Sequence, residues 1–155
     1  MTLNTEAITG NTATVPTGVE TSIYKVLQDF YLAFNSRDFN LMQDNWDNSD
    51  EIAMDNPLGG IKRGWSEIKE IYQRIFTGEA KVYVEFYDYS IVEFSGGFCA
   101  IGRERGHLQI RGEQLDLAIR TSRVYKLIDG VYKQVHHHGS IEDPKLLEQY
   151  QSLVG

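Results

Sequence analysis

Hydrophobic residues recur along the chain at two spacings, and the change of spacing divides the sequence into a helical half and a strand half. In the first half they recur every three or four residues, which is typical of amphipathic helices. This spacing predicts helices over residues 20–35, 39–46 and 65–77. A short extended run over 51–56 separates the last two, because Pro57 disfavours helical backbone in the residue before it.

From Lys81 onward, long runs rich in β-branched and aromatic residues predict strands. The predicted strands span residues 81–94, 98–110, 113–128 and 131–141. Asp129-Gly130, between the last two, is a strong hairpin signal. Long strands joined by tight turns form an antiparallel meander. Because helices come first and strands last, the predicted fold class is α+β, with the helices packed on one face of the sheet. A short helix is predicted after Asp143-Pro144.

Length and charge narrow the class of protein. The 155 residues are close to the usual size of one domain, and we predict a single domain over 20–155. Residues 1–19 are rich in Thr, Asn and Gly without periodicity, and we expect them to form a disordered or loosely docked tail. The net charge of −7 argues against nucleic-acid binding. No run of about 18 apolar residues is present, so no membrane segment is expected.

Cysteine content and the first residues bear on the compartment. Cys99 is the single cysteine of the sequence, so no internal disulfide can form. The first 19 residues contain no Lys or Arg and no apolar block, which argues against a secretory signal. We therefore expect a cytoplasmic protein.

The predicted strand over 81–94 is apolar on both faces. Alternation assigns one face to Val82, Val84, Phe86, Val92 and Phe94, and the other to Tyr83, Tyr87, Tyr89 and Ile91. A sheet with one face in water alternates between apolar and polar residues. Both faces are therefore expected to be covered, one by the helices and the other by a second subunit, which predicts a homodimer.

The order of elements and two short motifs resemble a known superfamily. A helix ending in Phe34-Asn35-Ser36-Arg37-Asp38 is followed by Met54-Asp55-Asn56-Pro57-Leu58-Gly59-Gly60, then by a helix opened by Lys62-Arg63-Gly64 and by the four strands. This pattern resembles the nuclear transport factor 2-like superfamily, and SnoaL-like domains within it. The resemblance covers about 20–141. It implies a cone-like fold, in which a strongly curved antiparallel sheet wraps the helices and encloses a small polar-lined pocket.

The C-terminal strands carry a second likeness. Residues 121–125, the Asp129-Gly130 turn and residues 134–140 are similar to the association domain of calcium/calmodulin-dependent kinase II and its bacterial relatives. Members of the superfamily include isomerases, cyclases, dehydratases, oligomerisation domains and transport factors. The resemblance therefore predicts the fold and says little about the activity.

Three successive histidines in the last predicted strand are the first candidates for chemistry. Alternation puts Tyr132, Gln134, His136, His138 and Ser140 on one face, and the resemblance implies that this face lines the cavity. His137 should point away. Two charged histidines about 6.6 Å apart would repel by about 2.5 kcal/mol at an effective dielectric constant of about 20. One of them should therefore be neutral and able to accept a proton.

Arginines on neighbouring strands suggest the charge of the ligand. The resemblance places Arg123 in the cavity, and Arg103 and Arg105 share a face of the strand over 98–110. A buried arginine is costly unless it meets a carboxylate, so these residues indicate an acidic ligand. The alternative is internal pairing with Glu85, Glu104 or Asp116.

These residues make up the predicted site. His136 or His138 would be the base, with Asp55 as orienter or alternative base, and Arg123 and Tyr31 would hold an oxyanion or carboxylate. Further predicted ligand-binding residues are Trp65, Tyr132, Gln134 and Arg105. Two alternatives stay open for the histidines: they are core residues without a chemical task, or they bind a metal ion with Asp55 as third ligand. We expect no metal and no other cofactor.

Two functions fit the sequence. The first is a SnoaL-like protein that binds a small acidic or aromatic molecule and, as an enzyme, catalyses isomerisation, cyclisation or dehydration by cofactor-free proton transfer. The second is an association module that forms dimers or larger rings around a vestigial pocket. The sequence leaves open whether the chain is an enzyme.

Overall fold

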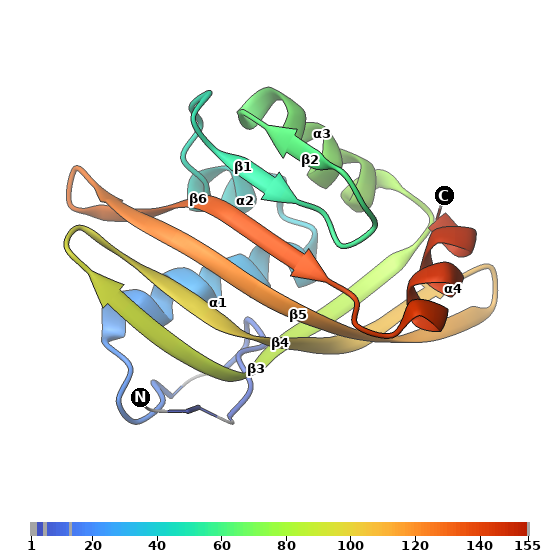
Figure 1. Cartoon of the computed structure of the whole chain (residues 1–155), viewed down its shortest axis with the longest axis horizontal. Coiled ribbons are helices and arrows are strands. Elements are labelled where there is room, and N and C mark those ends of the chain that lie inside the picture. The colour runs from blue at the N-terminus through green and yellow to red at the C-terminus, as the bar shows by residue number, and fades with distance from the viewer. Residues whose placement is uncertain (1–2, 5, 13, 155) are drawn as a thin grey trace.

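The computed structural model describes residues 3–4, 6–12 and 14–154, and consists of a strongly twisted sheet with helices against it (Figure 1). The helices are α1 (Thr21–Ser36), α2 (Phe39–Asn45), α3 (Trp65–Thr77) and α4 (Pro144–Val154). The strands are β1 (Ala53–Asp55), β2 (Ile61–Arg63), β3 (Lys81–Phe94), β4 (Gly97–Ile110), β5 (Glu113–Ile128) and β6 (Val131–Ser140). None of the described helices has the length and apolar character that crossing a membrane requires.

The sheet has six strands in the order β2-β1-β6-β5-β4-β3, and it does not close into a barrel. The predicted α+β class and the antiparallel meander of the four long strands are confirmed. Two features differ from the sequence analysis. β2 was not predicted, and β1 pairs with β6 in parallel, so the sheet is mixed. The parallel pair brings the segment before Pro57 beside the three histidines.

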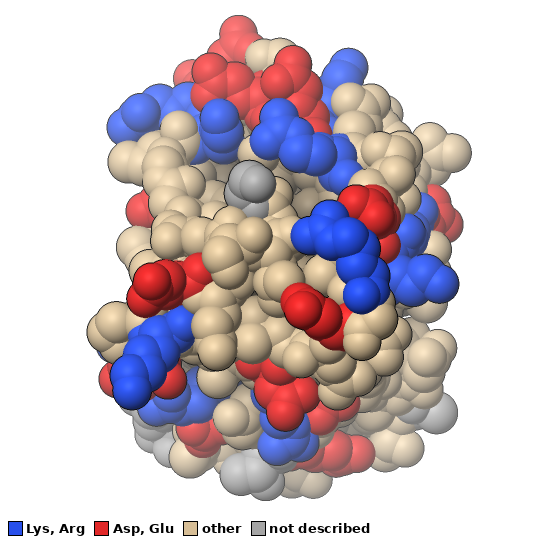
Figure 2. Space-filling view, turned by 90° about the vertical axis from the view of Figure 1, so that its right-hand side faces the viewer, with Lys and Arg blue, Asp and Glu red and all other residues tan. Residues whose placement is uncertain are grey.

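α4 lies at one end of the molecule, beside the turn between β4 and β5 (Figure 1). Figure 2 looks at this end and shows uncharged side chains gathered at its centre, with charged side chains around them. Arg111 of the turn donates to the carbonyl oxygen of Leu153 at 3.3 Å, and Gln151 donates to the carbonyl oxygen of Leu58 at 3.0 Å. These two bonds attach α4 to the turn between β4 and β5 and to the turn between β1 and β2.

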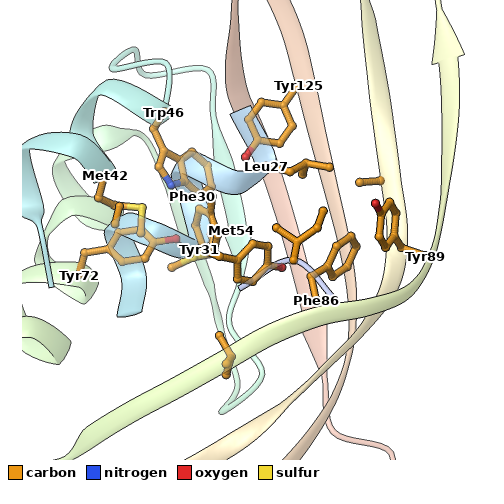
Figure 3. Packing of buried hydrophobic residues seen from close by; sticks show 14 of the residues in the cluster. Leu27, Phe30, Tyr31, Met42, Trp46, Met54, Tyr72, Phe86, Tyr89 and Tyr125 are labelled. Atoms are coloured by element: carbon orange, nitrogen blue, oxygen red, sulfur yellow. Dashed lines mark hydrogen bonds between the residues drawn. The ribbon is translucent and has the colours of Figure 1, made fainter. Parts of the chain in front are cut away.

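α1 supplies the centre of the core. Its buried stripe follows the predicted helical spacing and packs against β3, with the ring of Tyr31 stacked on Phe86 at 5.6 Å (Figure 3). The helix ends at Arg37, which has a left-handed backbone. The N–H of Arg37 then donates to the carbonyl oxygen of Phe34, and the N–H of Asp38 donates to that of Ala33. Asp38 then caps α2 by accepting from the N–H of Leu41.

β3 has a β-bulge that reverses its two faces. The pairing with β4 shifts between Tyr87 and Ser90, and Asp88 has a φ of 50°. Beyond this point Tyr89 is buried, whereas Val92 and Phe94 are 45% and 50% exposed. The prediction that Val92 and Phe94 share the face of Val84 and Phe86 is therefore wrong, because alternation counts correctly only along an uninterrupted ladder.

β6 has a bulge of the same kind, opposite β5. Tyr125 pairs with Gln134 and Val124 pairs with His136, so Val135 has no partner of its own. Gln134 before the bulge is fully buried. After the bulge the buried residue is His137, and His138 is exposed. The assignment of His136 and His138 to the cavity face is therefore wrong, and the residue expected to point away is the one that points in.

The N-terminal segment is docked where the structure describes it, rather than disordered. Asn4 and Tyr89 exchange backbone hydrogen bonds, as do Ile8 and Phe86, and the side chain of Ile8 is fully buried. Gly10 lies against α1 so closely that a Cβ atom there would be 2.6 Å from the Cα of Leu32. Residues 1, 2, 5 and 13 of the expected tail lie outside the described residues.

Docking of this segment can be tested with Ile8→Ala. The substitution removes buried methyl and methylene groups and should lower the free energy of unfolding by about 3 kcal/mol in urea denaturation. Ile61→Ala is the control, because Ile61 is half exposed and its truncation should cost less than about 0.5 kcal/mol. Equal effects of the two substitutions would show that the segment does not pack on β3 in solution.

Candidate functional site

A pocket of about 440 Å³ lies between the helix-covered face of the sheet and helices α1, α3 and α4. This volume is in the range of small-molecule sites. Its walls are mainly apolar side chains, among them Phe30, Ile75, Leu108, Leu117 and Ile119. The pocket was expected to be polar-lined, and this expectation is wrong for most of the wall. A ligand that fits it must bury mostly apolar surface.

α4 lines the pocket with Tyr150, Ser152, Leu153 and Val154. Burial, followed by the negative charge of Glu104, raises the pKa of Tyr150 to about 12. The Tyr150 hydroxyl therefore stays protonated and can donate a hydrogen bond at neutral pH. The helix closes one side of the pocket with two apolar residues, Leu153 and Val154, and with the neutral hydroxyl groups of Tyr150 and Ser152.

The polar part of the wall is a buried ion pair. Nη2 of Arg123 lies 2.9 Å from Oε2 of Glu104, and the side chains are 3% and 6% exposed. Nη1 of Arg123 donates to Oε1 of Gln134 at 2.8 Å. The guanidinium group also lies 3.5 Å from the ring centroid of Phe30. The charge of Arg123 is thus balanced by Glu104 inside the protein. Of the two possibilities left open by the sequence, an acidic ligand or internal pairing, internal pairing is the one that the structure shows for Arg123.

Tyr31 lies behind the ion pair and ties it to α1. Its hydroxyl donates to Oε2 of Glu104 at 2.6 Å and accepts from Nε of Arg123 at 3.4 Å. Burial, followed by the negative charge of Glu104, raises the pKa of Tyr31 well above its usual value. Tyr31 is therefore a fixed donor to the carboxylate, and it is not among the pocket-lining residues.

His137 is the histidine of the pocket. Its Nδ1 lies 3.3 Å from the carbonyl oxygen of Ser122, so this nitrogen carries the proton and donates, and Nε2 keeps its lone pair. A Cβ atom at Gly139 would be 3.2 Å from Nε2 and 3.1 Å from Cδ of Pro57, which shows how closely the ring is enclosed. Burial, followed by the positive charge of Arg123, lowers the pKa of His137 well below its usual value. The imidazole is therefore neutral.

The predicted catalytic residues lie together, but on the opposite face of the sheet. Nδ1 of His138 is 2.8 Å from Oδ2 of Asp55, and Nδ1 of His136 is 3.0 Å from the carbonyl oxygen of Ala53. None of Asp55, His136 and His138 lines the pocket. Their catalytic role in the cavity was inferred from alternation, and the bulge at Val135 removes that basis.

The predicted ligand-binding residues separate in the same way. Arg123 lines the pocket, as the resemblance implied, and its contact with a ligand stays a prediction. Gln134 is buried behind it, Tyr132 packs edge-on against Phe98, and Trp65 packs against Phe39. Arg105 lies outside the pocket and pairs with Glu85 at 2.7 Å, the internal pairing that the sequence analysis kept open.

Three residues of the polar wall were not in the predicted site. Glu104 had been named as a possible partner of an arginine. It lies between the outward-facing Arg103 and Arg105, so alternation along the strand could have predicted that its side chain points inward. His137 was assigned to the wrong face, since nothing local in the sequence marks the bulge. Tyr150 belongs to the C-terminal helix, which had no predicted place relative to the sheet.

Solved structures with the same fold define the class of protein. A proposed calcium/calmodulin-dependent protein kinase type II association domain from Thiobacillus denitrificans is 22% identical with a TM-score of 0.61, covering 76% of this chain and 93% of that one. The CaMKII hub of S. rosetta is 16% identical with a TM-score of 0.68, covering 82% and 99%. A proposed dehydratase of the NTF2-like (nuclear transport factor 2-like) family from Streptomyces avermitilis is 17% identical with a TM-score of 0.68, covering 77% and 93%. The fold is therefore NTF2-like.

Within this class the family is shown by sequence. The SnoaL-like domain model matches residues 23–144, and the chain belongs to the SnoaL-like domain family. The predicted resemblance is confirmed. α4 lies almost wholly beyond the matched residues, so its contribution to the pocket is a feature of this chain outside the family match. No protein of curated function matches the chain.

The ion pair in the pocket wall can be tested with Glu104→Gln. This change leaves Arg123 buried without a counter-charge and should lower the free energy of unfolding by about 3 kcal/mol or more. Glu85→Gln is the matched control, because it breaks the Glu85–Arg105 pair on the exposed side and should cost less than about 1 kcal/mol. Urea denaturation of both variants measures the difference, and similar costs would contradict the burial of the Arg123–Glu104 pair.

Proposed function

We propose that the chain binds a small, mainly apolar molecule in the pocket, with one polar group of that molecule against Arg123 and His137. The observation that carries this proposal is a buried ion pair and a neutral imidazole on the wall of a mainly apolar pocket. A buried ion pair adds little net stability compared with apolar residues of similar volume. Its presence at the pocket wall is better explained by a ligand than by stability.

Donors remain available at this end of the pocket. Arg123 has five N–H groups. One on Nη2 donates to Glu104, one on Nη1 donates to Gln134, and the N–H on Nε donates to Tyr31. The remaining N–H groups can donate to a carbonyl or hydroxyl oxygen of a ligand. Because Glu104 already balances the charge of Arg123, a neutral polar group fits this end better than the acidic group first expected.

His137 is the group available for proton transfer. Its Nδ1–H donates to the carbonyl of Ser122, and Nε2 is left as an acceptor near Pro57, which also lines the pocket. In a cofactor-free isomerisation, cyclisation or dehydration, His137 would take the role that the sequence analysis assigned to His136 or His138. The dehydratase name of the Streptomyces avermitilis structure is consistent with this reaction class.

Occupation of the pocket can be tested with the neutral fluorophore N-phenyl-1-naphthylamine, which brightens in apolar surroundings. Ile119→Trp adds a ring to the pocket wall and should weaken binding at least about tenfold, since the ligand loses most of its apolar contact area. Ile61→Trp is the control, since Ile61 is half exposed on β2 and outside the pocket, and should leave the titration unchanged. Equal binding by both variants would place the fluorophore elsewhere.

The polar end can be tested without unfolding the protein. The double change Arg123→Met with Glu104→Leu removes both charges and leaves neither unpaired, so it avoids the large cost of a single change. Tyr31 and Gln134 lose hydrogen-bond partners, which should cost about 1–3 kcal/mol each. The wild type should bind 2-acetylnaphthalene about tenfold more tightly than 2-ethylnaphthalene, because only the ketone accepts a hydrogen bond. The double variant should lose this preference. A preference that persists would show that Arg123 does not hold the carbonyl.

We further propose that the chain forms a homodimer through the exposed face of β3 and β4. Val92, Phe94 and Ile101 lie there, each at least 43% exposed, and the pairing of Val92 with Cys99 and of Ser90 with Ile101 brings them close together. Contiguous exposed apolar residues of this kind are typical of interaction surfaces. The kinase association domains among the structural neighbours are consistent with self-association.

Analytical ultracentrifugation tests this association. The wild type should sediment as a dimer at micromolar concentration, and Ile101→Lys should sediment as a monomer, because a lysine in an apolar interface must be desolvated. Ile61→Lys is the control, since Ile61 is half exposed on β2, at the opposite edge of the sheet from β3, and should not disturb the interface. A monomeric wild type at this concentration would contradict the proposal.

A further inference from the structure

Asp55, His136 and His138 form a compact cluster on the face of the sheet away from the pocket. Each offers one ligand atom, and these atoms all lie within 4.8 Å of one another. His138 and Asp55 are 52% and 29% exposed in their side chains, so an ion can reach them from solvent. The cluster shares no residue with the pocket wall, so a role for it is independent of the proposed ligand.

Strand pairing holds the three residues in register. In the parallel pair of β1 and β6, Asp55 lies opposite His138 and Ala53 lies opposite His136. Neighbouring strands are about 4.8 Å apart and residues two apart in a strand about 6.6 Å, so the three side chains start from three corners of one small rectangle. The fourth corner is Ala53, whose side chain is a single methyl group and leaves room beside the imidazole of His136.

The ring nitrogens are arranged as in metal sites. Nδ1 of His136 lies 3.0 Å from the carbonyl oxygen of Ala53 and donates to it, which leaves the lone pair of Nε2 free. Histidines that bind metals usually donate their other ring N–H to a carbonyl or carboxylate in this way. Two imidazoles and one carboxylate match the donors that zinc and related ions bind at about 2.0–2.2 Å. Small side-chain rotations of the half-exposed His138 and of Asp55 bring their ligand atoms to those distances.

We propose that Asp55, His136 and His138 bind one divalent transition-metal ion, with Zn²⁺ as the reference ion, on the outer face of β1 and β6. The exposed side of the cluster leaves a fourth position open to water or to another ligand. The metal-free alternative is a plain hydrogen bond between His138 and Asp55, which accounts for their 2.8 Å contact but gives His136 no role.

Isothermal titration of chelator-treated, tag-free full-length protein with ZnCl₂ tests this site. The wild type should bind one Zn²⁺ per chain. Asp55→Asn and His138→Gln each remove one ligand, and each should weaken binding at least about tenfold. The control is His107→Gln, because His107 lies outside both the cluster and the pocket, is stacked on Tyr83 at 5.5 Å and is two strands from β6 in the sheet. This variant should bind as the wild type does.

A second measurement guards against variants that lose their fold. Zn²⁺ should raise the Tm of the wild type and of His107→Gln, and should raise that of His138→Gln clearly less, because the stabilisation by a ligand falls as its Kd rises. His138 is half exposed, so its replacement should not unfold the sheet. The proposal is overturned by a wild type that binds no Zn²⁺ at micromolar concentration, or by His138→Gln that binds as tightly as the wild type.

Discussion

Val135 has no partner in β5, and the bulge that it forms in β6 decides which face of the sheet each of the following histidines occupies. Without the bulge, a buried Gln134 would place His136 and His138 on the pocket side. With it, His137 enters the pocket wall, and its two neighbours turn to the outer face, where Asp55 of β1 lies beside them. One β-bulge therefore produces two separate polar sites from three consecutive histidines.

The pocket side is held by a hydrogen-bonded chain that crosses most of the fold. Arg123 of β5 joins Glu104 of β4, and through Gln134 it reaches Asn45 of α2 at 3.2 Å. Asn45 in turn donates to the backbone carbonyl of Val26 in α1. Hydrogen bonds are strong in a low-dielectric interior, and each member of the chain is costly to remove because its buried partners lose a hydrogen bond that water does not replace. The chain also fixes the side chains at the polar end of the pocket.

The two faces of the sheet thus carry different kinds of surface. The inner face offers apolar walls with a charge-balanced polar end, which suits a small molecule of mainly apolar character. The outer face carries apolar side chains over β3 and β4, and the Asp55–His136–His138 cluster two strands away over β6 and β1. Ligand binding, self-association and metal binding therefore need not compete for the same residues.

The sequence alone determined the helices, the meander and its turns, because helical spacing, strand composition and the Asp129-Gly130 turn are local properties of the chain. The resemblance of its motifs to known proteins indicated the family and implied a place for Arg123 in the cavity. Tertiary structure alone decided the bulges at Asp88 and Val135, the parallel pairing of β1 with β6, and the docking of Ile8 on β3. Alternation states which residues share a face only while each residue has a partner, and the number of partners is set by a neighbouring strand far away in the chain.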